Sequence, residues 1–110
     1  MAIKANLIMD QGSDFSAVID LTDAAGNVYN LLGFTAAAQM RKNFASTTAY
    51  TFNAGTGGAN GRISLTLDNS ITDTVEPGRY MYDVEITSGG GVKTRVVEGI
   101  VTVNPGITRV

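Results

Sequence analysis

Glu76-Pro77-Gly78-Arg79-Tyr80-Met81-Tyr82-Asp83-Val84-Glu85-Ile86 is the stretch of this chain that decides its fold. The Pro-Gly pair favours a corner in the backbone. In the residues that follow, every second side chain is apolar or aromatic and shares one face, namely Tyr80, Tyr82, Val84 and Ile86. This period-two alternation is typical of a half-buried strand. The stretch therefore predicts a strand of a β-sandwich and not a catalytic loop.

The corner itself predicts a structural role for its residues. Tyr80 follows Pro77 and Gly78 at the spacing found where a tyrosine hydroxyl ties a crossing between strands back to the backbone in immunoglobulin-like sandwiches. Tyr82 stands two residues later, where many such domains carry a cysteine. Because this chain has no cysteine, an aromatic ring is expected to fill the core there and packing must supply the stability.

Alternation elsewhere predicts more strands, separated by turn-forming residues, over 3–7, 15–21, 28–31, 35–42, 50–52, 63–67 and 92–104. Only 35–42 has strong helix formers, and it is still expected to be a strand because it is short and lacks a capping box. Gly99 predicts a bulge or bend in the last strand. The fold class expected is an all-β, antiparallel, immunoglobulin-like β-sandwich of about seven strands in a single domain over 1–104, followed by a C-terminal extension over 105–110.

Composition narrows the class of function. The chain has 110 residues, which suits one domain, and its scattered charges sum to -2, so no basic field points to nucleic acid. It has no histidine or cysteine, which removes the commonest general base and the commonest ligands of zinc. No export signal and no apolar run long enough to span a bilayer is visible. We therefore expect a soluble protein with no membrane partner, metal or cofactor.

Three groups of residues invite a chemical interpretation. The glycine-rich segment 55–61 resembles a phosphate-binding loop in composition only, because no Gly-Lys-Ser/Thr follows and the next element is a strand, so a mobile hairpin loop is expected. The acidic residues near 15–21 could offer oxygen ligands to calcium, but turn and cap roles are favoured for Asp10, Asp14, Asp20 and Asp23. Asp83 and Glu85 could form a carboxylate pair, yet an exposed strand normally leaves such side chains solvated. No catalytic residue and no small-molecule substrate is predicted.

The order of short motifs along the chain carries a resemblance to a known family. The motifs are Asp10-Gln11-Gly12-Ser13-Asp14, Leu21-Thr22-Asp23 with Gly26, Leu32-Gly33-Phe34, Gln39-Met40-Arg41-Lys42, Gly61-Arg62-Ile63-Ser64-Leu65, Pro77 to Asp83, and Glu98-Gly99-Ile100-Val101-Thr102-Val103. In this order the chain resembles the immunoglobulin-like N-terminal domain of tailed-phage baseplate upper proteins and small virion proteins built like it. The chain differs by ending after one domain, which puts a role in carrying a receptor-binding module in doubt.

The resemblance implies a non-enzymatic structural protein of a bacteriophage virion, in the tail or baseplate, assembled in the host cytoplasm. Its partners would be other virion proteins, in multiple copies within a symmetric assembly. A capsid decoration protein bound to the major capsid protein is the close alternative. A carbohydrate-binding surface module is the third, although the chain has no tryptophan and most of its aromatic residues are on inward phases.

Residues outside the expected sandwich pattern are the predicted contacts between subunits. They are Met1, Ile3 and Lys4 at the N-terminus and Ile107 and Arg109 beyond the last strand. Pro105 cannot donate to a ladder, so strand pairing is expected to stop there.

Overall fold

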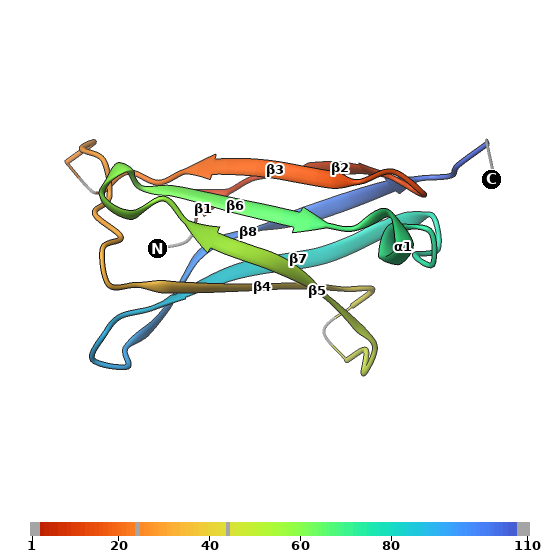
Figure 1. Ribbon diagram of the computed structural model, residues 1–110. Coiled ribbons are helices and arrows are strands. Elements are labelled where there is room, and N and C mark those ends of the chain that lie inside the picture. Colours follow the sequence, from red (N-terminus) through yellow and green to blue (C-terminus); the bar gives the residue numbers. More distant parts are fainter. Residues whose placement is uncertain (1–2, 24, 44, 108–110) are drawn as a thin grey trace.

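The computed structural model describes residues 3–23, 25–43 and 45–107, and these form a single all-β domain (Figure 1). Within this part of the chain the strands are β1 (Ile3–Lys4), β2 (Leu7–Asp10), β3 (Phe15–Asp20), β4 (Thr35–Arg41), β5 (Ala49–Thr56), β6 (Arg62–Leu67), β7 (Gly78–Thr87) and β8 (Lys93–Asn104). A 3₁₀ turn, η1 (Gly58–Asn60), and one helical turn, α1 (Asn69–Thr72), complete the described elements. The expected all-β single domain is confirmed.

The strands form two layers joined by one strand that belongs to both. In the large layer β8, β7 and β4 lie side by side, and β1 and β2 pair with the outer side of β8. In the small layer β3 pairs with β6. The first half of β5 pairs with β4 through residues such as Phe52, and its second half pairs with β6 through residues such as Ala54. The sheet therefore curls around its own interior, as Figure 1 shows.

The strand neighbours are those of an immunoglobulin-like sandwich. Strands β3, β6 and β5 are adjacent as strands B, E and D are in that fold, and β4, β7 and β8 are adjacent as C, F and G are. One part of the sheet departs from the antiparallel expectation, because β1 and β2 run parallel to β8. The first and last strands of the chain run in the same direction along one edge, so the sheet is mixed.

The core lies between the layers and follows from the alternation in the sequence. On β7 the side chains of Tyr80, Tyr82, Val84 and Ile86 are all buried, as the opening stretch predicts. Phe52 packs against rings from both layers, with ring centroids 5.7 Å from Phe15 and 6.4 Å from Tyr82. The other fully buried apolar side chains lie on β2, β4, β6 and β8 and in two connections, and include Met9, Leu31, Met40, Ile63, Leu65, Leu67, Val75, Val97 and Val101.

The segment 35–42, whose residues are good helix formers, contains the strand β4. Its inward positions Ala38 and Met40 are almost fully buried, while Gln39 between them is exposed. A helix would bury residues at a spacing of three or four, so the period-two burial explains why good helix formers are extended here. Tertiary packing has overridden local propensity.

Two connections differ from the prediction. The expected strand over 28–31 is wrong, because Val28 makes only an isolated bridge to Thr22 and the rest of that segment is irregular. The crossing from β6 to β7 contains α1, whose N-cap Asp68 accepts hydrogen bonds from the amide and hydroxyl of Ser70, and these lower the pKa of Asp68. The buried Thr72 hydroxyl donates to the Ser13 carbonyl at 2.8 Å, which fastens α1 over one end of the sandwich.

The bulge in β8 lies elsewhere than predicted. Val84 pairs with Val97 and Glu85 pairs with Arg95, so Val96 is the extra residue and both it and Val97 are buried. Gly99 pairs regularly with Tyr82. Glycine is required at this position for another reason, since a Cβ there would lie 2.1 Å from the carbonyl oxygen of Ala5. β8 ends at Asn104, directly before Pro105.

Candidate functional site

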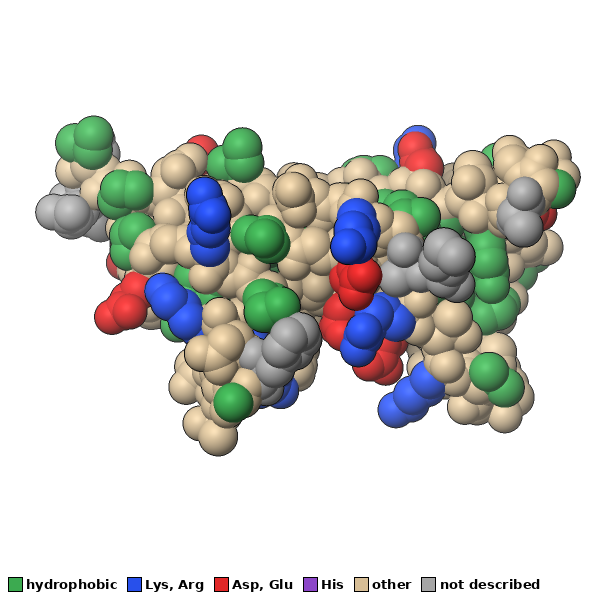
Figure 2. Space-filling view, turned by 180° about the vertical axis from the view of Figure 1, so that it is seen from behind, with side chains coloured by type: hydrophobic (Ala, Val, Ile, Leu, Met, Phe, Trp, Pro, Cys, Tyr) green, Lys and Arg blue, Asp and Glu red, His purple; other side chains and the backbone are tan. Residues whose placement is uncertain are grey.

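The outer face of the large layer carries the candidate site, a hollow of about 620 Å³ that opens to solvent. Figure 2 views the molecule from this side, with side chains of both charges crowded close together on it. The loop between β4 and β5 and the hairpin between β7 and β8 project at opposite ends of the same layer (Figure 1). The lining side chains come from β1, β4, β7 and β8 and from the segments beside them, and include Lys4, Asn6, Gln39, Arg41, Met81, Asp83, Glu85, Arg95, Glu98 and Ile100.

An apolar strip crosses this face. We define it as Ile8, Ile100 and Met81, which are 70%, 40% and 37% exposed. Met81 and Ile100 are direct partners across β7 and β8, and Ile8 lies on the next strand. Exposing three large apolar side chains on neighbouring strands to water is unfavourable, so this strip is suited to contact with a partner.

A row of charges runs beside the apolar strip. Asp83 and Glu98 face each other across β7 and β8, which places two like charges at a destabilising position. Arg95 resolves the conflict, because its Nε lies 3.1 Å from an Asp83 oxygen and its guanidinium lies 3.8 Å from Glu98. The bulge at Val96 breaks the regular alternation of β8 next to this arginine, and re-aiming a side chain is a known use of bulges.

Cations flank this row on both sides. Lys4 on β1 is the ladder partner of Glu98. Arg41 on β4 donates to the Ser46 carbonyl at 2.7 Å and to the Gln39 side chain at 3.2 Å. The arrangement is a patterned surface of alternating charge, with its charged groups partly solvated and engaged with one another. Such a surface can recognise a partner by complementary charge and shape.

The predicted corner residues are brought together at one end of the sandwich. The Tyr80 hydroxyl donates to the Glu76 carbonyl at 2.8 Å, four residues upstream, which is the hydrogen bond expected of a tyrosine corner. Gly78 has a φ of 139°, a conformation that favours glycine, and it begins β7. Burial, and then the neighbouring Tyr50 and Glu76, raise the pKa of Tyr80. Pro77, Gly78 and Tyr80 do not line the hollow, whereas Tyr82 is part of its lining.

Tyr82 has a role that the sequence did not reveal. Its hydroxyl donates to the carbonyl oxygen of Ala5, and burial raises its pKa to about 12. The Ala5 amide donates to Glu98 at 3.0 Å, so a regular parallel ladder would next join the Ile100 amide to the Ala5 carbonyl. The Asn6 side chain accepts from that amide instead, at 3.1 Å. The ladder is thus broken between β1 and β2 with each of these polar groups satisfied.

The predicted contacts between subunits are only partly described. Ile3 and Lys4 form β1 inside the large layer, so they do not lie outside the sandwich as expected, although both are exposed. Ile107 lies beyond β8 and is 94% exposed. Met1 and Arg109 fall outside the described residues.

The acidic residues near β3 have structural partners. Asp14 accepts from the amide and side chain of Asn69, at 2.8 and 2.9 Å, and Asp23 accepts from the amides of Ala25 and Asn27 within its turn. Asp20 pairs with Arg62 at 3.0 Å. In the described part of the chain no three groups of the kind that ligate metals are gathered together.

The glycine-rich segment is packed against the body of the domain. Gly55 lies within β5, and Gly58 and Gly61 accept backbone hydrogen bonds from Leu31 and Leu21. A Cβ on Gly61 would lie 2.7 Å from the Leu21 carbonyl oxygen. The segment forms the expected hairpin connection between β5 and β6, and these contacts tie it to residues 21–31. Among the described helical turns, none is long and apolar enough to cross a bilayer.

Comparison with known proteins gives similarity of fold only. No protein-family model matches the chain, and no curated relative matches it. The structure is similar to that of the Listeria monocytogenes internalin-like protein lmo2027, with a TM-score of 0.53 and 18% identity over 94% of this chain. The chain spans only 28% of that structure. A voltage-gated sodium channel (VGSC) beta subunit, solved in work on multimeric cell-adhesive interactions, gives a TM-score of 0.47 and 11% identity over 92% of each chain.

Proposed function

We propose that this protein is a non-enzymatic structural subunit of a tailed-phage virion, in the tail or baseplate, and that it binds a neighbouring virion protein through the hollow face of its large layer. The observation that supports this most is the juxtaposition of the apolar strip with the row formed by Asp83, Glu98 and Arg95 on one open face. Apolar contact supplies affinity, and patterned charge supplies orientation.

The chemistry of the face favours a protein partner over a small molecule. Small-molecule sites are concave pockets that enclose most of the ligand and hold a few polar groups in apolar walls. Here the side chains of Arg95 and Asp83 are 54% and 36% exposed and are spread over a wide, open sheet. A broad partner surface can match this pattern, whereas a small ligand would leave most of it in water.

The order of motifs from Asp10 to Val103 motivates the assignment to a phage particle, and the tail location follows from the resemblance to baseplate upper proteins. A capsid decoration protein would use the same kind of surface, so location within the particle separates the two. The carbohydrate-binding alternative is disfavoured by the aromatic residues. Each aromatic side chain in the described part of the chain is buried or half-buried, which leaves no exposed ring on which a sugar could stack.

Labelling of particles tests the proposal directly. Immunogold electron microscopy with antibodies against the purified protein is expected to mark the tails of intact virions. Label on heads would replace the tail assignment with the decoration role. Particles free of label would contradict a virion role altogether.

A matched pair of variants tests the face. Ile100→Glu places a charge in the apolar strip at a half-exposed position, so the fold should persist while incorporation into particles falls at least tenfold. Val28→Glu is the control, since Val28 is 56% exposed in a connection outside the hollow. Equal incorporation of the two variants, with equal melting temperatures, would argue against this face as the contact.

A further inference from the structure

The free edge of β3 lies apart from the hollow face. β3 is the last strand of the small layer, and its register with β6 runs from Phe15, opposite Leu67, to Asp20, opposite Arg62. No other described strand pairs with it along these residues. An unpaired strand edge is a template for another strand unless the protein blocks it.

The direction of the free backbone groups follows from one hydrogen bond. The Leu21 amide donates to the Gly61 carbonyl at 2.8 Å and extends the β3–β6 register by one pair. Hydrogen-bonded pairs alternate along an antiparallel ladder, so the odd-numbered residues of β3 direct their backbone groups toward β6. The amides and carbonyls of Ser16, Val18 and Asp20 therefore point to the free edge.

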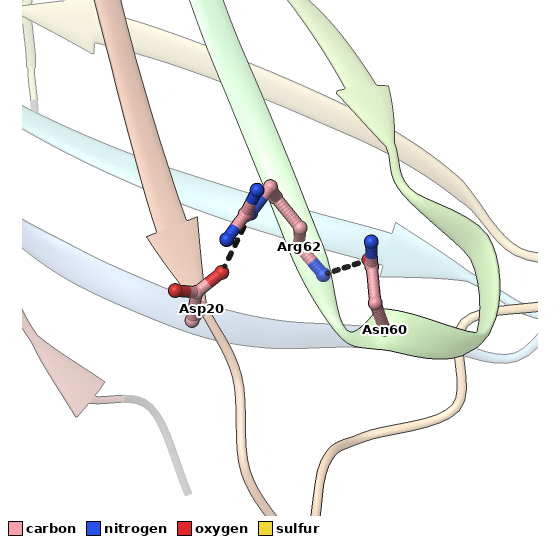
Figure 3. A network of polar contacts seen from close by, with 3 residues as sticks. All are labelled: Asp20, Asn60 and Arg62. Atoms are coloured by element: carbon pink, nitrogen blue, oxygen red, sulfur yellow. Dashed lines mark hydrogen bonds and ion pairs between the residues drawn. The ribbon is translucent and has the colours of Figure 1, made fainter.

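No charged side chain of β3 itself guards this edge. Asp20 is the only charged residue of β3, and its carboxylate is held on the β6 side by the Arg62 guanidinium at 3.0 Å (Figure 3). Arg62 is itself fixed, because its amide donates to the Asn60 side chain at 3.1 Å. The middle of the edge carries Val18, which is 55% exposed. The strand contains no lysine, proline or glycine, the residues that usually interrupt such an edge.

We propose that two copies of this chain pair through β3, antiparallel and about a two-fold axis at Val18, so that the two small layers form one continuous sheet. The occupant of the edge is a second copy because β3 is complementary to itself in this register. Val18 faces its own counterpart, and Ser16 faces Asp20 of the other copy. All three residues with free backbone groups then lie in hydrogen-bonded pairs.

Charge selects this register over the neighbouring one. A two-fold axis at Ala17 would give a similar overlap but would set Asp20 opposite Asp14 of the other copy, twice per dimer. Like charges directly opposite each other destabilise a strand pair. With the axis at Val18, Asp14 faces Thr22 and Asp20 faces Ser16, so no like charges are directly opposed. The pairing does not use the hollow face, so it can be tested independently of the proposed function.

Sedimentation velocity on the purified full chain, over a hundredfold range of concentration, tests the pairing. The expected result is a monomer–dimer equilibrium that Val18→Lys weakens at least tenfold, because two ammonium groups would meet at the axis. Val28→Lys, an equally exposed position, is the control and should leave the equilibrium unchanged. A wild-type chain that stays monomeric throughout, or a dimer indifferent to Val18→Lys, would overturn the proposal.

Cysteine cross-linking fixes the register, since the chain has no cysteine of its own. Val18→Cys is expected to form a disulfide-linked dimer under mild oxidation, because residues opposite each other in such a pair have Cα atoms about 5.5 Å apart, within disulfide range. Ser16→Cys alone should not cross-link, but mixed with Asp20→Cys it should. Efficient cross-linking of Ser16→Cys to itself would exclude the axis at Val18.

Discussion

The two edges of the curled sheet differ in how well they are protected against pairing with another strand. At the edge of the large layer, β1 and β2 are interrupted at Ala5 and Asn6, and three side-chain devices hold the break: the Tyr82 hydroxyl, the Asn6 side chain and the missing Cβ of Gly99. At the edge of the small layer, β3 runs unbroken for 6 residues, and its single charged side chain is paired with the neighbouring strand β6. A broken edge resists pairing with another strand, whereas a continuous edge whose one charge is held by a neighbouring strand leaves its backbone groups available for pairing.

The difference teaches that edge protection is built from residues distant in sequence. The break in the first strand depends on Tyr82 and Gly99, which lie on β7 and β8. The absence of a charge at the free edge of β3 depends on Arg62, which lies on β6 and holds Asp20 away from that edge. The tendency of each edge to pair with another strand is therefore determined by residues of neighbouring strands, and substitutions at those residues can change it.

Gly99→Ala should break the protected edge most severely. The added methyl would lie 2.1 Å from the Ala5 carbonyl oxygen, and both clashing atoms are fixed to backbone. We expect a loss of about 3 kcal/mol in the free energy of unfolding, at the upper end for overpacking, measured by urea denaturation. Gly89→Ala is the matched control, since its nearest neighbour would be 3.8 Å away, and it should cost under about 0.5 kcal/mol. Similar losses in both variants would contradict the close approach.

Tyr82→Phe should loosen the same edge more gently. The Ala5 carbonyl loses its donor, and the expected cost is about 1 kcal/mol in the free energy of unfolding. Hydrogen exchange of the Ala5 amide should accelerate. Tyr80→Phe, which removes the hydroxyl that bonds Glu76, should cost a similar amount without changing exchange at Ala5. Exchange at Ala5 that is the same in wild type and Tyr82→Phe would show that the hydroxyl does not hold the break.

Alkaline pH should have a related effect through the same residue. Burial raises the pKa of Tyr82 from its ordinary value of 10.0 to about 12 in the folded protein. The folded state favours the neutral phenol, so this contribution to stability is complete below the unfolded pKa and is lost as pH rises through the folded pKa. Between these two values the melting temperature of the wild type should fall more than that of Tyr82→Phe. Parallel pH profiles would refute this origin.

Arg62→Gln should produce the smallest change, at the continuous edge. Asp20 loses its ionic partner and becomes free to turn toward the second copy, so the dissociation constant of the proposed dimer should rise by a few-fold. Sedimentation velocity measures the shift. Arg79→Gln, a change of charge on the outer face of the large layer, is the control and should leave the equilibrium unchanged. A tighter dimer in Arg62→Gln would contradict the inference that Arg62 keeps the Asp20 charge away from the edge.

Much of the fold was predictable from local pattern. The alternation over 78–87 predicted β7 and its buried residues, and Pro77, Gly78 and Tyr80 predicted the corner whose hydrogen bond the structure contains. These features depend on residues close in sequence and on a period of two, so a single chain segment displays them. The expectation at Gly99 failed because local sequence cannot show that Ala5 approaches it from the opposite end of the chain.

The candidate site was less predictable. Asp83 and Glu85 were visible as outward residues, but their partner Arg95 lies beyond a hairpin, and the bulge that follows Arg95 determines that Glu98 faces Asp83. Likewise, the segment 28–31 has strand-like residues, yet the backbone there leaves the sheet after the single bridge at Val28. Partners across strands depend on register, and one extra residue changes which side chains meet.

The sequence by itself determined that this chain is all-β, which residues of its long strands face inward, and where its corner lies, because these depend on alternation and turn chemistry within short segments. Only the tertiary structure decided that the first strand runs parallel to the last, that one edge is broken and the other bare, and that charges from four strands share a face. Those outcomes depend on which strands become neighbours, and that choice is made by packing of the whole chain around one interior.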